Sequence, residues 1–399
     1  MGEPAGAAAG QGTVDAARVV GVDLGGTKIA AALVAEDGTC GEVRTVPTPG
    51  AEGPEALLAA VTDLVRDVLA GDGRLAAVRG GERATSGDRL PLGGGRSVAV
   101  GIGAAGAIDR DQGVVVSSTD TLAGWAGTPV AARLRDALGV PVAVLNDVDA
   151  HALGEARHGA AAGAGSALVV AAGTGIGAAV VLDGDVLPGA HHMAGEMGHL
   201  PVPGAEGLFC ACGREGHLEA IASGVGLAHL YAALTTDALT SREIVALADR
   251  GDAAAQETVR RSATALGRGL AGVVTVLDPE VLLLTGGLAE AGDLWWSSVE
   301  AALRADLVDH LADIPLRLGA LGPRAAIVGA AEAARDLLAV PMPTPSTPPT
   351  PSTPPTPSTP PTPSTPPTPS TPPTPSTPPT PSTPPTTPPA TPPSLPPAT

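Results

Sequence analysis

The sequence predicts a duplicated α/β fold in which two similar lobes enclose a cleft. Apolar runs of strand length alternate with amphipathic helical stretches from residue 18 to about residue 340. Two segments that lie about 150 residues apart, RVVGVDLGGTKIAAALVAEDG and ALVVAAGTGIGAAVVLDGD, share one plan of strand, glycine turn and strand. This length of Ala-, Gly-, Val- and Leu-rich chain is also typical of two domains rather than one.

The first half reads as a hairpin, a helix and a further strand. Residues 18–38 predict two apolar strands joined by a Gly-Gly-Thr turn. Residues 52–70 place leucine and valine at helical spacing, whereas the Gly/Arg-rich residues 71–97 predict a loop. Residues 98–109 predict a buried strand that runs into a glycine-containing loop.

The second half begins near Trp125 with GTPVAARLRDALG, which predicts a helix with Pro129 near its first turn. A strand is expected at 140–147 and a helix at 148–159. Residues 166–185 repeat the pattern of strand, glycine turn and strand. A long amphipathic helix (253–277), a strand with a Gly-Gly turn, and a last helix complete the folded part.

These elements divide the chain into a flexible N-terminus (1–17), a small α/β lobe (18–124) and a large α/β lobe (125–323). The C-terminal helix, 324–340, is expected to complete the small lobe. Residues 341–399 are almost only Pro, Thr and Ser, with PSTPPT recurring every six residues. Because such a tail has no apolar face to bury, we expect it to be disordered and extended, in the manner of polyproline.

The composition excludes several kinds of partner. The formal net charge is -18, and the tail carries no charged residue, so the folded part bears all of it. An acidic surface repels nucleic acid and anionic membranes. Residues 1–17 do not resemble a signal peptide, and no apolar run reaches transmembrane length. Three cysteines are too few for a disulfide framework, so we expect the protein to reside in a reducing cytoplasm.

The glycine hairpins predict a phosphate site. Glycines let backbone N–H groups point at an anion without a Cβ in the way. Thr27 adds a hydroxyl, Lys28 (the only lysine) adds a point charge, and Asp23 can hold a water on Mg²⁺. Two such hairpins would grip a triphosphate from both sides, although each alone is equally well an ordinary β-turn. Their recurrence, with the glycine pair Gly286–Gly287 after a buried strand, favours a nucleotide.

Two other phosphate motifs fit less well. GTGIGA (173–178) formally matches the dinucleotide fingerprint, and Glu196 lies about 20 residues further on. That fingerprint needs a helix directly after the glycines, whereas AAVVLDGDV reads as a strand. A nicotinamide site is therefore disfavoured. A Walker loop is excluded because no GxxxxGK[ST] occurs.

Asp147 stands where a predicted strand ends and a predicted helix begins. The helix dipole and the free N–H groups of the first turn should keep its carboxylate ionised. An ionised carboxylate at a cleft suits a general base that takes a proton from an attacking hydroxyl. The alternative is that Asn146 or Asp147 only caps the helix.

HHMAGEMGH (191–199) packs three histidines and a glutamate into nine residues. Sugar recognition needs carboxylates and amides that accept several hydroxyl protons, and Glu196 and Glu219 fit that need. A surface loop with incidental polar residues is the alternative. For His191 and His192 this alternative is preferred.

Two of the three cysteines, Cys210 and Cys212, stand in a CAC triplet, with His199 before them and His217 after. In a reducing compartment such a cluster favours a metal ion over a disulfide. A tetrahedral Zn²⁺ site is chemically sound, although the spacing is not the common CxxC knuckle. The zinc would be structural and would fix the loop that carries the two glutamates. Cys40 stands alone and is expected to be an inert thiol.

Six motifs occur in the order DLGGTK, LND, GTGIG, AGEMGH, CACGREGHLE and LLLTGG. In this combination the chain resembles the ROK family of bacterial sugar kinases and related repressors, over about residues 18–340. The resemblance implies an actin/hexokinase-like (ribonuclease H-like) two-lobe fold with a central cleft. It also implies ATP with Mg²⁺, a hexose substrate, a structural Zn²⁺, and a homodimer or homotetramer.

The resemblance also implies roles for individual positions, with Asp147 as the catalytic base. His199 would touch the sugar and the metal together. The implied nucleotide-binding residues are Asp23, Gly25, Gly26, Thr27, Lys28, Gly173, Thr174, Gly175, Gly286 and Gly287. The implied substrate-binding residues are Gly106, Asn146, Glu196, His199 and Glu219, and the implied metal ligands are His199, Cys210, Cys212 and His217.

The chain departs from the family pattern at three places. His217 stands where the third cysteine of the zinc motif usually is, and Ala105 replaces the proline of the GxPG loop. Glucose kinases of the family often carry Asn-Leu before the tryptophan of the next region, whereas this chain has Thr121-Leu122 before Trp125. Because that asparagine contacts the sugar in the relatives, the preferred hexose stays open.

The expected activity is therefore ATP-dependent phosphorylation of a hexose, with glucose converted to glucose 6-phosphate. The alternatives within enzymes are an N-acetylmannosamine kinase and an N-acetylglucosamine kinase. From other classes come a sugar-sensing regulator without a DNA-binding domain and a catalytically silent sugar-binding protein. The family's repressors carry an N-terminal helix-turn-helix, whereas only about seventeen small residues precede the first strand here, so the regulator is disfavoured.

Overall fold

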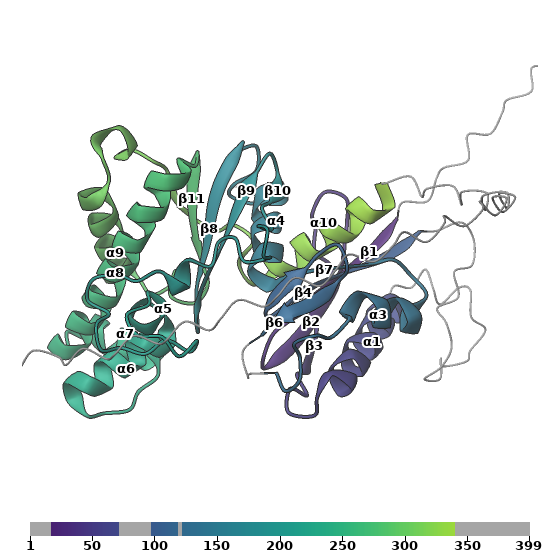
Figure 1. Cartoon of the computed structure of the whole chain (residues 1–399), viewed down its shortest axis with the longest axis horizontal. Coiled ribbons are helices and arrows are strands. Elements are labelled where there is room, and N and C mark those ends of the chain that lie inside the picture. The colour runs from purple at the N-terminus through teal and green to yellow at the C-terminus, as the bar shows by residue number, and fades with distance from the viewer. Residues whose placement is uncertain (1–16, 72–96, 119–121, 340–399) are drawn as a thin grey trace, which may run out of the picture. The chain divides into compact units, whose positions relative to one another are not determined.

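Two five-stranded sheets form the framework of the computed structural model, which describes residues 17–71, 97–118 and 122–339 (Figure 1). The first sheet has the order β3-β2-β1-β4-β7, and the second has the order β10-β9-β8-β11-β12. In both, a central strand pairs antiparallel with its hairpin partner and parallel with the next strand. The repeated order confirms the predicted duplicated α/β fold.

The strands of the first sheet are β1 (Arg18–Leu24), β2 (Lys28–Val34), β3 (Arg44–Pro47), β4 (Val98–Ala104) and β7 (Val142–Asn146). Those of the second are β8 (Ser166–Ala172), β9 (Ile176–Leu182), β10 (Asp185–Val186), β11 (Val281–Thr285) and β12 (Leu316–Leu318). A small separate hairpin consists of β5 (Ala107–Asp109) and β6 (Val114–Ser117). Residues 1–16, most of the predicted loop 71–97 and the repeat tail 341–399 lie outside the described residues.

Helices cover both faces of the first sheet because its strands are apolar on both sides. Helices α1 (Pro54–Gly71) and α3 (Val130–Leu138) pack on the face that carries Val20 and Val22. Helix α10 (Ala325–Ala339) packs on the opposite face, against Val19 and Ala99. The first sheet includes β7, which ends at Asn146. The sequence suggested a lobe boundary at residue 124, so this sheet contains a strand from beyond that boundary.

The second sheet is also covered on both faces. Helix α4 (Asp147–His158) packs on the face with Val169 and Leu283. The opposite face, with Leu168 and Leu282, packs against the remaining helices. These are α5 (Glu219–Ala222), α6 (Gly224–Thr235), α7 (Ser241–Asp249), α8 (Ala253–Leu277) and α9 (Asp293–Asp306). The predicted helix at 253–277 is confirmed with the same bounds.

Helix α10 comes close to the first sheet because the strands below it carry glycine. A Cβ at Gly21 would collide with the carbonyl group of Ile327, and a Cβ at Gly101 would collide with that of Ala330. Both glycines lie in the middle of their strands, so the reason for glycine here is close backbone approach. That the C-terminal helix completes the small lobe stays a prediction.

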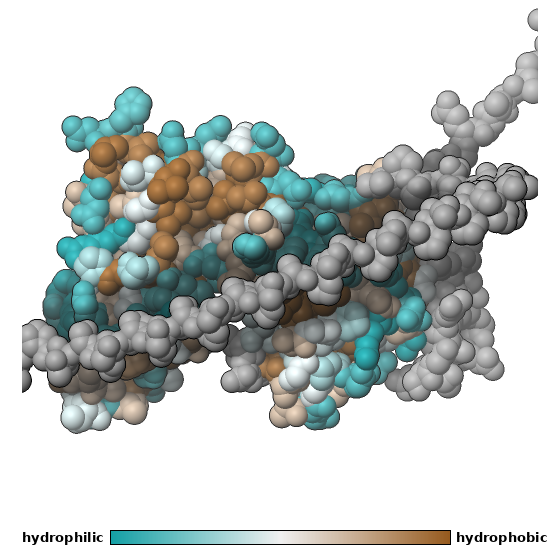
Figure 2. Space-filling model, in the orientation of Figure 1, coloured by the Kyte–Doolittle hydropathy of each residue, from teal (hydrophilic) through white to brown (hydrophobic). Residues whose placement is uncertain are grey.

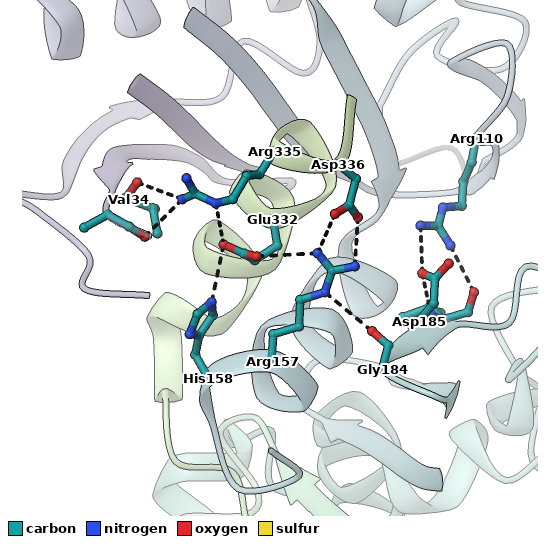
Figure 3. A network of polar contacts seen from close by, with 11 residues as sticks. Val34, Arg110, Arg157, His158, Gly184, Asp185, Glu332, Arg335 and Asp336 are labelled. Carbon is teal, nitrogen blue, oxygen red and sulfur yellow. Dashed lines mark hydrogen bonds and ion pairs between the residues drawn. The ribbon is translucent and has the colours of Figure 1, made fainter. Parts of the chain in front are cut away.

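A buried carboxylate ties α10 to α4 (Figure 3). Glu332 is 5% exposed, and it accepts hydrogen bonds from Arg335 Nε at 3.0 Å and Arg157 at 3.4 Å, with His158 Nε2 at 3.3 Å. Arg157 also makes two 2.8 Å hydrogen bonds to Asp336. A buried charge is tolerated only when it is paired in this way. The network fixes the helix that begins at Asp147.

Hydrophilic and hydrophobic residues are mixed over the face shown in Figure 2. The most exposed large apolar side chains are Val276, Phe209 and Val308, at 82%, 70% and 57%. Single exposed apolar residues are normal on protein surfaces, so they indicate no particular partner. No helix in the described ranges combines the length and apolar character needed to cross a bilayer. The homodimer or homotetramer stays a prediction.

Candidate active site

A pocket of about 1080 Å³ collects residues from both halves of the chain. The expected site residues that line it are Gly106, Asn146, Asp147, Gly173, Thr174, Gly175, Glu196, His199, Cys212, His217, Glu219 and Gly286. The other expected site residues, all within the described part of the chain, are not among those that line it. They are Asp23, Gly25, Gly26, Thr27, Lys28, Cys210 and Gly287.

The turn between β8 and β9 is one wall of the pocket. Gly173 N donates to Gly175 O at 3.0 Å, which closes a tight turn. Behind the turn, Glu219 Oε2 accepts from Ile176 N at 3.0 Å, and a Cβ at Gly175 would lie only 2.6 Å from this oxygen. Strand β9 follows the turn directly, which agrees with the argument against a dinucleotide fingerprint.

The turn between β1 and β2 is built in the same way but lies outside the pocket lining. Gly25 N donates to Lys28 O at 3.1 Å, and Thr48 Oγ1 donates to Gly25 O at 2.7 Å. Gly26, Thr27 and Lys28 are exposed. Because Thr48 anchors the base of the turn, the exposed N–H and hydroxyl donors at its tip are left accessible to an anion.

Asn146 is the N-cap of α4, as the alternative reading allowed. Its Oδ1 accepts from Val148 N at 2.8 Å and Asp149 N at 3.2 Å, and its Nδ2 donates to Gly106 O at 2.9 Å. The amide is therefore held between the start of α4 and the Gly106 carbonyl group. Asp147 is the first residue of the helix and lines the pocket, so its carboxyl group is not needed as the cap.

The start of the helix is not the strongest influence on the pKa of Asp147. Burial raises the pKa of the Asp147 carboxyl, and hydrogen bonds from the Val148 backbone and the Asn146 side chain only partly offset this. Desolvation outweighs the helix N-terminus because the group has little water around it. A carboxyl group with a raised pKa is a stronger base once it has lost its proton.

Two more buried carboxyl groups lie within electrostatic reach of Asp147. Burial and the charge of Asp147 raise the pKa of Asp23 to about 6, although Lys28 opposes this. Burial raises the pKa of Asp149 to about 7, with Arg110 opposing. Closely spaced carboxylates destabilise one another, and a divalent cation would relieve this. Asp23 is therefore suited to the Mg²⁺ site that the sequence indicated.

Replacing Asp23 with asparagine should stabilise the fold at pH 8 but not at pH 4. Because the folded-state pKa is raised from 3.8 to about 6, ionising Asp23 costs stability as pH rises through this window. The amide removes that cost, so the free energy of unfolding should increase by about 3 kcal/mol at pH 8. Urea denaturation at the two pH values measures it. An equal effect at the two pH values would contradict the argument. The control is Asp63→Asn, at an exposed position on α1.

Four side chains bring their ligand atoms within 4.8 Å of one another: His199, Cys210, Cys212 and His217. Cys210 Sγ lies 3.6 Å from His199 Nδ1, and Cys212 Sγ lies 3.2 Å from His217 Nδ1. Usual Zn–S and Zn–N bond lengths at a tetrahedral angle give a sulfur–nitrogen separation of about 3.6 Å. The residues therefore fit a Zn²⁺ ion, including the histidine that replaces a cysteine.

The cluster is connected to the acidic side of the pocket. Cys210 Sγ lies 3.4 Å from Glu219 Oε1, and His199 Nε2 lies 3.7 Å from Glu196 Oε2. Burial raises the pKa of Glu196, while His199 lowers it and Asp147 raises it. The predicted base, one expected sugar carboxylate and the cluster are thus neighbours. His192 lies 3.9 Å from Asp109 and, like His191, stays unassigned.

Sequence reasoning missed three polar residues of the pocket wall: Ser117, Ser118 and Arg214. Arg214 lies inside the CACGREGHLE motif. Its position between Cys212 and His217 could have indicated that it lies near the cluster. Ser117 is the last residue of the short strand β6 and Ser118 follows it, and this segment has no motif of its own. Their place in the pocket depends on how this hairpin packs.

The paired sheets and the pocket define a protein of the actin/hexokinase-like class. The chain belongs to the ROK family, whose model matches residues 19–79 and 89–336. It is 32% identical over 325 residues to a glucokinase of Halalkalibacterium halodurans, covering 78% of this chain and 92% of the relative. It is 31% identical over 297 residues to an N-acetylmannosamine kinase of Shigella flexneri, covering 73% and 92%.

Solved structures of ROK proteins are also similar to this chain. The ROK hexokinase of Thermus thermophilus has a TM-score of 0.67 and 34% identity, covering 81% of this chain and 99% of that chain. A ROK family glucokinase from Streptomyces griseus in complex with glucose and AMPPNP has a TM-score of 0.65 and 29% identity, covering 80% and 99%. These similarities support the actin/hexokinase-like fold over the part of the chain that they cover.

Proposed function

We propose that the protein is an ATP-dependent hexose kinase that converts glucose to glucose 6-phosphate. One observation carries the proposal: Asp147, the glycine turn Gly173–Gly175 and the carboxylates Glu196 and Glu219 line a single pocket. A base, a phosphate turn and hydroxyl acceptors are the parts that phosphoryl transfer to a sugar requires. The named glucokinase relatives support the same reaction.

In this reaction, Asp147 accepts the proton of the sugar's 6-hydroxyl group while the oxygen attacks the γ-phosphorus in line. The backbone N–H groups of the two glycine turns hold the phosphates, and Thr27 and Lys28 add a hydroxyl and a positive charge. In this proposal, Gly286 and Gly287, after β11, lie near the adenosine. Asp23 would help to hold Mg²⁺, which would supply neutralisation of the charge on the phosphates.

Substrate orientation falls to the other side of the pocket. Glu196, Glu219 and His199 accept or donate hydrogen bonds to sugar hydroxyls, together with Asn146 and Gly106. Zn²⁺ held by the His/Cys cluster would supply rigidity to this wall rather than chemistry. Glu219 joins the two functions, since its two oxygens contact Ile176 N and Cys210 Sγ.

An N-acetylmannosamine kinase is the second candidate, because a relative of that name is nearly as similar as the glucokinase relatives. Thr121 also stands where glucose kinases of the family often carry asparagine, before Leu122 and Trp125, so the substrate can be a hexose other than glucose. A sugar-sensing regulator would need the pocket without turnover, and the buried base at its wall argues against that.

A coupled assay over a panel of hexoses tests the proposal. Glucose, mannose, N-acetylmannosamine and N-acetylglucosamine are each supplied with Mg²⁺ and either ATP or polyphosphate. We expect the highest kcat/KM for glucose with ATP. A clear preference for N-acetylmannosamine would establish the second candidate, and no turnover of any sugar with either donor would overturn kinase activity.

A further inference from the structure

The loop between β4 and β5 is held by two side chains at consecutive carbonyl groups. Trp125 Nε1 donates to Ala105 O at 3.0 Å, and Asn146 Nδ2 donates to Gly106 O at 2.9 Å. Ala105 and Gly106 line the pocket, whereas Trp125 is only 1% exposed and packs in the core of the first lobe. The position of the loop is thus fixed by hydrogen bonds from Trp125 and Asn146.

Holding a carbonyl group also orients the amide on the same peptide unit. In a trans peptide the C=O and N–H bonds point in opposite directions, and the described residues contain no cis peptide bond. Since Ala105 O points at the buried indole, the N–H of Gly106 points away from the core. Gly106 itself lines the pocket, so the direction away from the core is the direction of a bound ligand.

The conformation of Gly106 makes this arrangement specific to glycine. Its φ is 106°, a value that L side chains rarely adopt, and a Cβ would lie 2.5 Å from Ser117 O. A proline at position 105 would fix the backbone before this turn, but the chain has alanine there. The indole hydrogen bond therefore replaces a restraint that the local sequence lacks.

We propose that Trp125 is a positioning residue for substrate binding: its indole N–H holds the Ala105 carbonyl and so directs the Gly106 N–H at a hydroxyl oxygen of the sugar. This inference rests on the proposed function. Trp125 is buried and is not among the residues that line the pocket, so it acts through the loop rather than by touching the substrate. Its loss should weaken sugar binding and leave phosphoryl transfer from ATP intact.

The test compares Trp125→Phe with Trp296→Phe. The second variant is a matched control, because Trp296 Nε1 also donates to a backbone carbonyl, Ala289 O at 2.6 Å, and lies outside the pocket lining. Trp125→Phe should raise the KM for glucose about tenfold, the value of one hydrogen bond, with the KM for ATP and kcat nearly unchanged. Trp296→Phe should leave the KM for glucose unchanged.

Equal KM values for glucose in the two variants would overturn the inference while the proposed function stands. In the wild-type protein, hydrogen–deuterium exchange of the Gly106 amide should slow when glucose is added, and an unchanged rate would also overturn it. This second measurement needs no variant to fold. A wild-type protein that neither binds nor phosphorylates any sugar of the panel would overturn the proposed function and the inference together.

Discussion

Replacing Asp147 with asparagine should lower kcat by about 10²–10⁴-fold, the usual contribution of a general base. The dissociation constant for glucose should change little. Asparagine has the same shape and can keep the hydrogen bond to the N-terminus of α4, but it cannot accept a proton. Steady-state kinetics with a coupled assay measure kcat, and isothermal calorimetry measures glucose binding without ATP.

Asp149→Asn is the matched control for this variant. Asp149 lies on the same helix, is partly buried as Asp147 is, and has a pKa raised to about 7, so the change removes a comparable carboxyl group. It does not line the pocket, and kcat should stay within about threefold of the wild type. If Asp147→Asn keeps wild-type turnover, or if both variants lose it equally, Asp147 is not the base.

The hairpins and helices were predictable because their signals are local. Glycine turns between apolar runs define β1–β2 and β8–β9, and the helical spacing of apolar residues defines α8 to its last residue. The extent of the first sheet was not predictable. It depends on the parallel pairing of Gly101 with Ala143 and Ile102 with Val144, about forty residues apart, and no local pattern encodes such a contact.

In the site, too, the features with local sequence signals were predictable and those that depend on distant contacts were not. The motifs place Asp147, Glu196, His199 and Glu219 in one pocket, as the sequence indicated. The pKa of Asp147 could not be predicted, because it reflects burial by residues from several elements, whereas the helix N-terminus is visible in the sequence. The role inferred for Trp125 likewise depends on a contact across 20 residues that carries no motif.

Replacing Cys210 with serine should remove zinc from the purified protein and destabilise it. Cys210 is 5% exposed and contacts both His199 and Glu219, so its loss opens the cluster and frees the wall of the pocket. We expect a loss of about 2–4 kcal/mol, or roughly 3–6 °C in Tm, and a raised KM for glucose. Metal analysis and thermal unfolding measure the first two effects. Cys40→Ser, which changes the cysteine outside the cluster, is the control.

The histidine that departs from the family motif gives the sharper version of this test. His217→Ala should lose zinc as Cys210→Ser does, because His217 Nδ1 lies 3.2 Å from Cys212 Sγ and has no substitute. His217→Cys should retain zinc, since a thiolate is an equally good fourth ligand. A wild-type protein without zinc, or zinc retained at full stoichiometry in His217→Ala, would show that the four side chains only pack together. The loop bearing Glu219 would then owe its position to hydrogen bonds alone.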